Sequence, residues 1–136
     1  MVDAAYDSIP DIPPNGVADA QMEALRVPPH SVQAEQAVLG GLMLDNAAWD
    51  KIADRVTEQD FYRREHQLIF AAIASLAEND RPFDLVTVND ELVRLGSSEE
   101  VGGLAYLGML ANETPTAANI KAYAAIVREQ SVVRQL

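Results

Sequence analysis

The segment that decides the fold is residues 57–79, TEQDFYRREHQLIFAAIASLAEN. Its first four residues have the pattern of a capping box, in which a threonine and an acidic residue three positions later bond to each other's backbone N–H groups. Apolar or aromatic side chains then recur at intervals of four and three residues: Tyr62, His66, Ile69, Ile73 and Leu76. This spacing is that of an α-helix with one buried face, so we expect a helix that ends near Asn79.

Two further helices are expected upstream of this segment. Ser31 is a favourable N-cap for a helix over residues 32–44, in which apolar side chains recur every four residues. Asp45 caps a second helix, whose amphipathic stripe occupies positions i, i+3, i+4 and i+7: Trp49, Ile52, Ala53 and Val56.

Gly40 and Gly41 stand in the middle of the helix expected over residues 32–44. Each glycine lowers helix propensity by about 1 kcal/mol relative to alanine. Two explanations fit the sequence about equally well. Either the missing side chains allow another backbone to approach closely, or the glycines are simply tolerated.

Downstream, Asn79–Pro82 has the composition of a turn. Residues 85–88, LVTV, are compatible with a strand, but the sequence offers no second strand with which it would pair. Thr87 and Asp90 fit better as a capping box that opens a fourth helix, and Gly96 ends that helix.

The remaining sequence predicts two more helices. Gly102 and Gly103 precede a helix over residues 104–112 that is apolar nearly all round. Residues 114–116, Thr-Pro-Thr, begin a last helix that continues to Leu136. The sequence therefore predicts an all-α fold: a compact bundle of about five to six helices, followed by a long C-terminal helix that begins a helical hairpin.

Composition divides the chain and excludes several classes of protein. We expect an acidic, disordered tail over residues 1–27, a globular helical domain over 28–115 and the first helix of a hairpin over 116–136. The net charge of −11 disfavours tight binding of nucleic acid by this segment alone, since DNA affinity depends on cations. There is no cysteine, no signal peptide and no apolar stretch of about 20 residues, so we expect a soluble, cytoplasmic protein with no membrane partner.

No catalytic or ligand-binding motif is apparent. The residues from Gly103 to Gly108 match the glycine spacing of a phosphate-binding loop, but Met109 and Leu110 follow where a lysine and a hydroxyl residue are required. His66 lies on an apolar helix face, which favours a hydrogen-bonded core histidine over a catalytic one. Adjacent carboxylates such as Asp90 and Glu91 are interpreted as solvated charges. We therefore expect no catalytic, cofactor-binding or metal-binding residue in this chain.

The order of several motifs is more specific than any one of them. These motifs are, in chain order, Pro28-Pro29-His30-Ser31, Ala34-Glu35-Gln36-Ala37-Val38-Leu39-Gly40, Asp60-Phe61-Tyr62, His66-Gln67, Ile69-Phe70, Asp84-Leu85-Val86-Thr87-Val88, Gly102-Gly103, Tyr106-Leu107 and Pro115-Thr116-Ala117-Ala118-Asn119. Together they resemble the N-terminal domain of the bacterial replicative DNA helicase of the DnaB type, from about Pro28 to Leu136.

The resemblance implies a longer protein. A helical linker and an ATPase domain would follow, and the whole would be an ATP-dependent DNA helicase and ATP hydrolase that uses ATP and Mg. It would assemble from dimers into a hexameric ring, act at the replication fork, recruit primase, pass single-stranded DNA through the ring and accept a helicase loader. The acidic tail before Pro28 has no assigned role in the family.

Two interfaces are predicted. The apolar helix over residues 104–112 needs cover on two sides, and in the family the tyrosine after the Gly-Gly pair lies in the region that meets primase. The predicted primase interface is therefore Tyr106 with Gly102, Gly103 and Met109, although plain core packing of Tyr106 fits nearly as well.

The last helix carries the predicted oligomer interface. Ile120, Tyr123, Ala124 and Val127 share one face, whereas the apolar residues of the second half lie on roughly the opposite side. One domain core cannot cover both groups of apolar residues. The group in the second half is therefore covered either by a following helix or by another subunit, or else the end of the helix is frayed. The predicted interface residues are Ile126, Val132, Val133, Leu136 and Tyr123.

Two other functions compete with the helicase assignment. One is a stand-alone acidic helical adaptor unrelated to replication, and the other is a small independent enzyme with buried carboxylates. The last helix runs to Leu136 without a stop signal, which argues against both because a complete domain usually ends with a cap.

Overall fold

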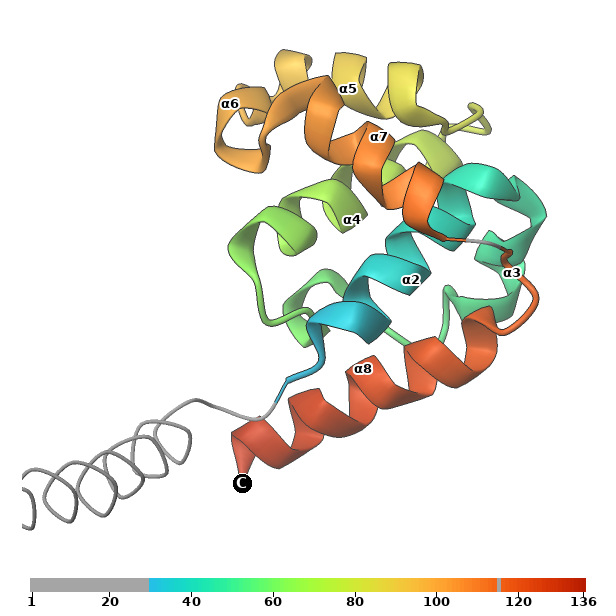
Figure 1. Cartoon of the computed structure of the whole chain (residues 1–136), viewed down its shortest axis with the longest axis vertical. Coiled ribbons are helices and arrows are strands. Elements are labelled where there is room, and N and C mark those ends of the chain that lie inside the picture. Colours follow the sequence, from blue (N-terminus) through green and yellow to red (C-terminus); the bar gives the residue numbers. More distant parts are fainter. Residues whose placement is uncertain (1–29, 115) are drawn as a thin grey trace, which may run out of the picture.

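The computed structural model describes residues 30–114 and 116–136, and the predicted acidic tail at 1–27 lies outside these ranges. The described residues form seven α-helices and two single 3₁₀ turns and contain no strand, so the predicted all-α fold is confirmed. The elements, labelled as in Figure 1, are α2 (Val32–Leu44), η1 (Asn46–Ala48), α3 (Trp49–Ile52), η2 (Glu58–Asp60), α4 (Arg64–Glu78), α5 (Leu85–Arg94), α6 (Ser98–Val101), α7 (Gly103–Glu113) and α8 (Ile120–Gln135).

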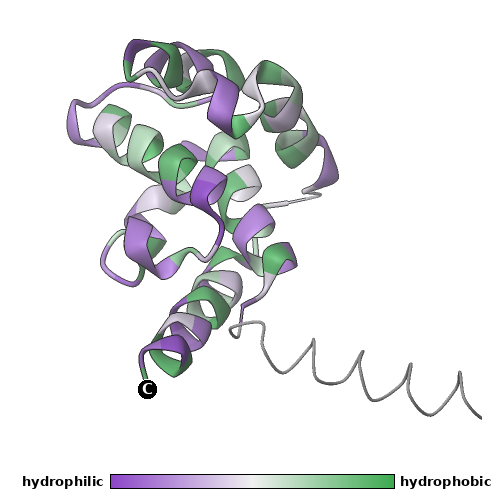
Figure 2. Cartoon of the chain, turned by 90° about the vertical axis from the view of Figure 1, so that its left-hand side faces the viewer, coloured by the Kyte–Doolittle hydropathy of each residue, from purple (hydrophilic) through white to green (hydrophobic). Residues whose placement is uncertain are grey.

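Helix α2 is the centre of the fold. Figure 1 shows it in the middle of the molecule, with α7 on one side, α8 on the other and α4 behind. Val38, Leu39 and Leu42 of this helix have no exposed surface. Helices α5 and α6 lie at one end of the molecule and α8 at the opposite end in both views (Figures 1 and 2). The two ends therefore offer separate surfaces.

Gly40 is required where α2 crosses α7. A Cβ atom on Gly40 would lie 2.1 Å from Thr114 Oγ1 and 2.5 Å from the backbone oxygen of Leu110. On Gly41 it would lie 3.3 Å from Ile120 Cδ1, the end of a flexible side chain. Of the two explanations for the glycine pair, close approach of another backbone therefore holds for Gly40. At Gly41 a Cβ atom would closely approach only the flexible end of a side chain, so glycine is tolerated there rather than required.

Helix caps follow the sequence in part. Ser31 caps α2 by accepting the N–H of Ala34, as predicted. Residues 57–60 do form a capping box, but it opens the turn η2, and α4 begins four residues later at Arg64. Gly96, predicted to end the fourth helix, lies just beyond α5 with a left-handed φ of 77°.

The predicted Thr87–Asp90 capping box was wrong. Asp84 is the N-cap of α5, because its Oδ1 accepts the N–H groups of Val86 and Thr87, each at 2.9 Å. Thr87 is the third helical residue and accepts the N–H of Asp84 in return. Starting the helix at Leu85 places Val88, which has no exposed surface, in the core.

Two helix boundaries differ from the sequence prediction, and one helix is additional to it. Helix α3 ends at Ile52, so the prediction of one helix that reaches Val56 was wrong. Ala53, which was expected on the apolar stripe of that helix, is exposed. A short helix, α6, that the sequence did not predict precedes Gly102. The last helix begins at Ile120 rather than after Pro115, with Asn119 as its N-cap.

Candidate interaction surfaces

A buried polar network joins α2, α4 and α7. His66 on α4 has no exposed surface; its Nδ1 lies 2.7 Å from Glu35 Oε1 on α2, and its Nε2 lies 2.7 Å from the hydroxyl of Tyr106 on α7. Glu35, 1% exposed, also accepts the N–H of Tyr62 at 2.6 Å. The prediction that His66 is a hydrogen-bonded core histidine is confirmed.

The donors in this network can be assigned from chemistry. An ionised carboxylate only accepts, so Nδ1–H of His66 donates to Glu35. The Gln36 amide donates to the Tyr106 oxygen at 3.3 Å, and the Tyr106 hydroxyl forms a second hydrogen bond with Nε2 of His66. Each group has a partner without any ligand, so the network stabilises the packing of three helices and needs no catalytic role.

Tyr106 is therefore turned inward. Its hydroxyl bonds to buried His66, and its ring lies parallel to the histidine ring with 5.9 Å between centroids. The surface of α7 instead presents Leu104, which is 48% exposed, followed by the small residues Ala105 and Gly108. Leu104 was not among the predicted interface residues, although its place directly after the Gly-Gly pair was a usable signal.

The other members of the predicted primase interface lie around the start of α7. Gly102 is exposed with a left-handed φ of 103°, and Gly103 is half-buried with a φ of 63°. Met109 is half-buried and packs against the core. Gly102 and Gly103 thus lie beside Leu104, whereas Met109 lies on the α2 side of the helix.

Helix α8 has two unlike sides. Ile120, Ala124 and Val127 are buried in the core, and Ser131 continues the same stripe at 1% exposure. Most residues of the predicted oligomer interface are exposed on the other side: Ile126 (38%), Val132 (42%), Val133 (46%) and Leu136 (99%). Tyr123 is half-buried against the core. An exposed apolar row of this kind is unusual for a surface without a partner.

The second half of α8 also contacts the domain, through polar side chains that the apolar pattern did not reveal. Asp60, 2% exposed, accepts bonds from Arg128 Nη1 at 2.9 Å and from the Ser131 hydroxyl at 2.8 Å. The backbone oxygen of Asp60 accepts a bond from Arg134 Nη2 at 2.7 Å. The last turns of α8 are therefore attached at the turn η2.

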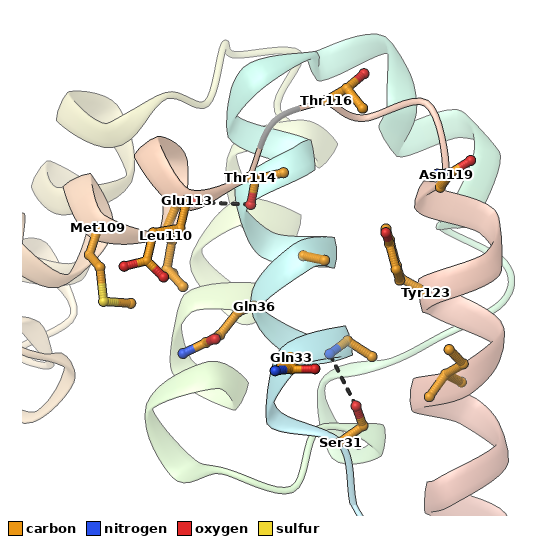
Figure 3. A pocket seen from close by; sticks show the side chains of 13 residues that line it. Ser31, Gln33, Gln36, Met109, Leu110, Glu113, Thr114, Thr116, Asn119 and Tyr123 are labelled. Carbon is orange, nitrogen blue, oxygen red and sulfur yellow. Dashed lines mark hydrogen bonds between the residues drawn. The ribbon is translucent and has the colours of Figure 1, made fainter.

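A groove of about 460 Å³ runs between α2, α7 and α8. Figure 3 shows α2 as its floor, α7 with Met109 on one side and α8 with Tyr123 on the other. Ile126 also lines this groove, so members of both predicted interfaces border it. Its only charged lining residue is Glu113, and no catalytic grouping is present among the residues that line it.

The sequence analysis did not predict that three carboxylates among the described residues are buried: Glu35, Asp60 and Glu91. Glu91, interpreted as solvated, is instead 6% exposed, and the guanidinium of Arg94 and the hydroxyl of Ser75 bond to it and lower its pKa from 4.5 to about 2. The spacing in the sequence could have indicated this burial for Glu35, because it lies three and four residues before the buried Val38 and Leu39 and so on the same helix face. All three carboxylates have partners and none faces an open cavity with a second catalytic group.

Neither a phosphate-binding loop nor a cluster of metal ligands is found among residues 30–114 and 116–136. The glycine spacing from Gly103 to Gly108 lies within helix α7 rather than in a loop, and Met109 and Leu110 follow it in place of the lysine and hydroxyl residue of a phosphate-binding loop. Over residues 30–114 and 116–136, no three His, Asp or Glu side chains come close enough together to hold a metal ion. None of the helices described here combines the length and apolarity needed to span a membrane.

Comparison with known proteins gives one consistent result. Residues 27–129 match the family described as the DnaB-like helicase N terminal domain. The chain is 51% identical over 119 residues to the replicative DNA helicase DnaB of Haemophilus influenzae, which covers 88% of this chain and 25% of that protein. It is 50% identical over 111 residues to DnaB of Geobacillus stearothermophilus, covering 82% of this chain and 24% of the relative.

A solved structure is also similar. The crystal structure of the N-terminal domain of DnaB helicase from Mycobacterium tuberculosis aligns with a TM-score of 0.79 and 43% identity, over 81% of this chain and 76% of that one. This chain spans about a quarter of the length of the helicases it matches.

Proposed function

Because the chain belongs to the DnaB-like helicase N-terminal domain family, we propose that it is the assembly and docking domain of a longer, hexameric, ATP-dependent replicative DNA helicase. The match over residues 27–129, with relatives four times as long, carries this proposal. In the longer protein, a separate ATPase domain binds ATP and Mg and hydrolyses the ATP. A stand-alone adaptor is not favoured, since the relatives named above are replicative helicases.

The assembly surface is the exposed row on α8. Ile126, Val132, Val133 and Leu136 are apolar side chains that this domain leaves exposed, and apolar surface is stabilised by association. Dimers form through this row, and dimers assemble into the ring. We place this protein in the cytoplasm. Because the net charge of this chain is negative, it binds single-stranded DNA weakly by itself and encloses DNA only as part of the assembled ring.

The primase-docking surface is the start of α7. Leu104 supplies an exposed apolar side chain, with the exposed small residues Gly102 and Ala105 beside it and the half-buried Gly103 and Gly108 nearby. Tyr106 supports this surface from beneath through His66 rather than by touching the partner. A helicase loader is a further partner of the same collar, with no surface assigned.

Docking is tested with the longer protein and primase from the same organism. Leu104→Asp places a charge on the proposed surface and should weaken primase binding about tenfold or more, since central apolar contacts dominate interface energies. Leu44→Asp is the matched control, because Leu44 is equally exposed (48%) at the far end of α2. Fluorescence anisotropy with labelled primase measures both affinities, and equal affinity for the two variants would refute this docking surface.

Helicase activity is tested separately. The longer protein should unwind forked DNA only with ATP and Mg, and native mass spectrometry should show six copies. Absence of ATP-dependent unwinding in a correctly assembled protein would contradict the proposed function.

A further inference from the structure

Asp60 joins two parts of the chain that are far apart in sequence. Its Oδ2 accepts the N–H of Thr57 at 2.8 Å within the turn η2, while its Oδ1 faces α8 and accepts bonds from Arg128 and Ser131. With Arg134 on its backbone oxygen, Asp60 contacts three residues spaced by three along one face of α8. One residue thus serves both as the cap of a turn and as the attachment point of a helix.

The last part of α8 lacks the apolar anchoring of the first part. Its buried apolar stripe ends at Val127, and the one buried residue among 128–136 is Ser131, at 1% exposure. Burying a hydroxyl is costly unless it is bonded, and here the bond is to a charged carboxylate. The attachment of residues 128–136 to the domain is therefore mainly by hydrogen bonds.

The receiving side is itself held in place. Phe61, directly after Asp60, has no exposed surface, and Glu35 of α2 accepts the N–H of Tyr62. The guanidinium carbon of Arg134 lies 5.4 Å from the centre of the Tyr62 ring, a cation–π arrangement. The turn that carries Asp60 is thus fixed to the centre of the fold.

We propose that Asp60 is a positioning residue: its carboxylate sets the direction and the rotation of the last two turns of α8, and so the outward aim of Val132, Val133 and Leu136. Hydrogen bonds weaken steeply with angle, whereas apolar contacts have no preferred direction, so this attachment defines an orientation that burial alone does not. The inference rests on the proposed function of the α8 row as an assembly surface and adds what holds that row in place.

The proposal is tested on this chain through the motion of α8. Asp60→Asn keeps the shape and removes the charge, and Ser131→Ala removes one hydroxyl while raising helix propensity. Both should accelerate amide hydrogen exchange in residues 128–135 about tenfold or more, while exchange of core amides such as Leu39 changes far less. If apolar packing alone held the helix, Ser131→Ala would leave exchange equal or slower.

Orientation is measured directly by electron–electron double resonance. The chain contains no cysteine, so paired spin labels on exposed Glu78 and Gln135 after their replacement by cysteine report the distance from α4 to the end of α8. The distribution should be narrow in the wild type and broader in both variants. Glu91→Gln is the control, because it removes another buried, arginine-paired carboxylate remote from α8, and it should leave the distribution narrow.

Unchanged exchange and an unchanged distribution in Ser131→Ala would overturn the proposal, even if Asp60→Asn failed to fold. Failure of the proposed function looks different. If Ser131→Ala loosens α8 while the longer protein associates with the affinity of the wild type, the positioning role stands and the α8 row is not the assembly surface.

Discussion

Replacement of Gly40 by alanine tests the packing at the centre of the fold. The new Cβ would lie 2.1 Å from Thr114 Oγ1, 2.9 Å from Thr114 Cβ and 2.5 Å from the backbone oxygen of Leu110. Rotation of Thr114 does not relieve the contact with a backbone atom, so α2 and α7 must separate. Turning the Thr114 side chain away from the new Cβ would in addition break the bond from its hydroxyl to the Leu110 oxygen, now 2.9 Å.

The magnitude follows from three contributions. Overpacking of a core costs about 1–3 kcal/mol. Loss of the threonine hydrogen bond costs about 1 kcal/mol. Alanine in a helix interior gains about 1 kcal/mol over glycine. Gly40→Ala should therefore lower the free energy of unfolding by about 2 kcal/mol.

Two other helical glycines serve as controls. Gly41→Ala meets only Ile120 Cδ1 at 3.3 Å and Ala117 atoms at 3.5 Å, so the gain in propensity offsets a small adjustment. Gly108→Ala meets nothing within 4 Å and should stabilise the chain by up to about 1 kcal/mol.

Urea unfolding followed by circular dichroism measures the series. With a slope of about 1–3 kcal/mol per M, Gly40→Ala should lower the midpoint by roughly 1 M. Gly41→Ala should stay near the wild type, and Gly108→Ala should lie at or above it. Equal midpoints for the Gly40 and Gly41 variants would refute the close-packing argument.

Three further predictions concern buried polar groups. The pKa of Glu91 is about 2 in the folded chain, below its ordinary 4.5, so the stability that its ionised carboxylate contributes is present above about pH 4.5 and is lost as the pH falls toward 2. The difference in free energy of unfolding between the wild type and Glu91→Gln, measured from urea midpoints, should therefore shrink over that range. A constant difference would argue against the ion pair. Tyr106→Phe removes the partner of His66 Nε2 and should cost about 1–2 kcal/mol in thermal unfolding, whereas unchanged stability would mean that this bond is absent. Asn46→Ala removes bonds in both directions to the Phe83 backbone and should cost about 2 kcal/mol, with rapid exchange of the Phe83 amide; a protected amide would contradict it.

Helix periodicity predicted the core better than it predicted the ends of helices. Ile69, Ile73 and Leu76 are buried on one face of α4, as their spacing requires. At the start of α5, however, two capping patterns overlap, and local sequence permits either Asp84 or Thr87 as the cap. Burial of Val88 decides for Asp84, and that burial depends on helices elsewhere in the chain.

The buried carboxylates show the same limit. Glu35 bonds to His66, 31 residues away, and Asp60 bonds to Ser131, 71 residues away. Neither pairing has a local signal, because nothing in the sequence says which helices become neighbours. The resemblance to the helicase family includes Glu35, Asp60 and His66 within its motifs, and the structure supplies the physical reason for their types at these positions.

The α8 row could be located from sequence, because Ile126, Val132 and Val133 fall opposite the buried stripe. The hydrogen bonds that attach this part of α8 to the domain could not be predicted from the sequence. Ser131, Arg128 and Arg134 have the appearance of ordinary surface residues until η2 is placed beside them.

The claim that α8 joins copies of this protein is tested most directly by sedimentation equilibrium of the longer protein with Val133→Asp. The matched control is Val86→Asp, which introduces the same charge at an exposed valine in the first turn of α5, at the opposite end of the fold, where an acidic residue is favourable. We expect the wild type and Val86→Asp to associate alike at micromolar concentration, while Val133→Asp shifts to smaller species. Association of Val133→Asp with the affinity of the wild type would contradict it.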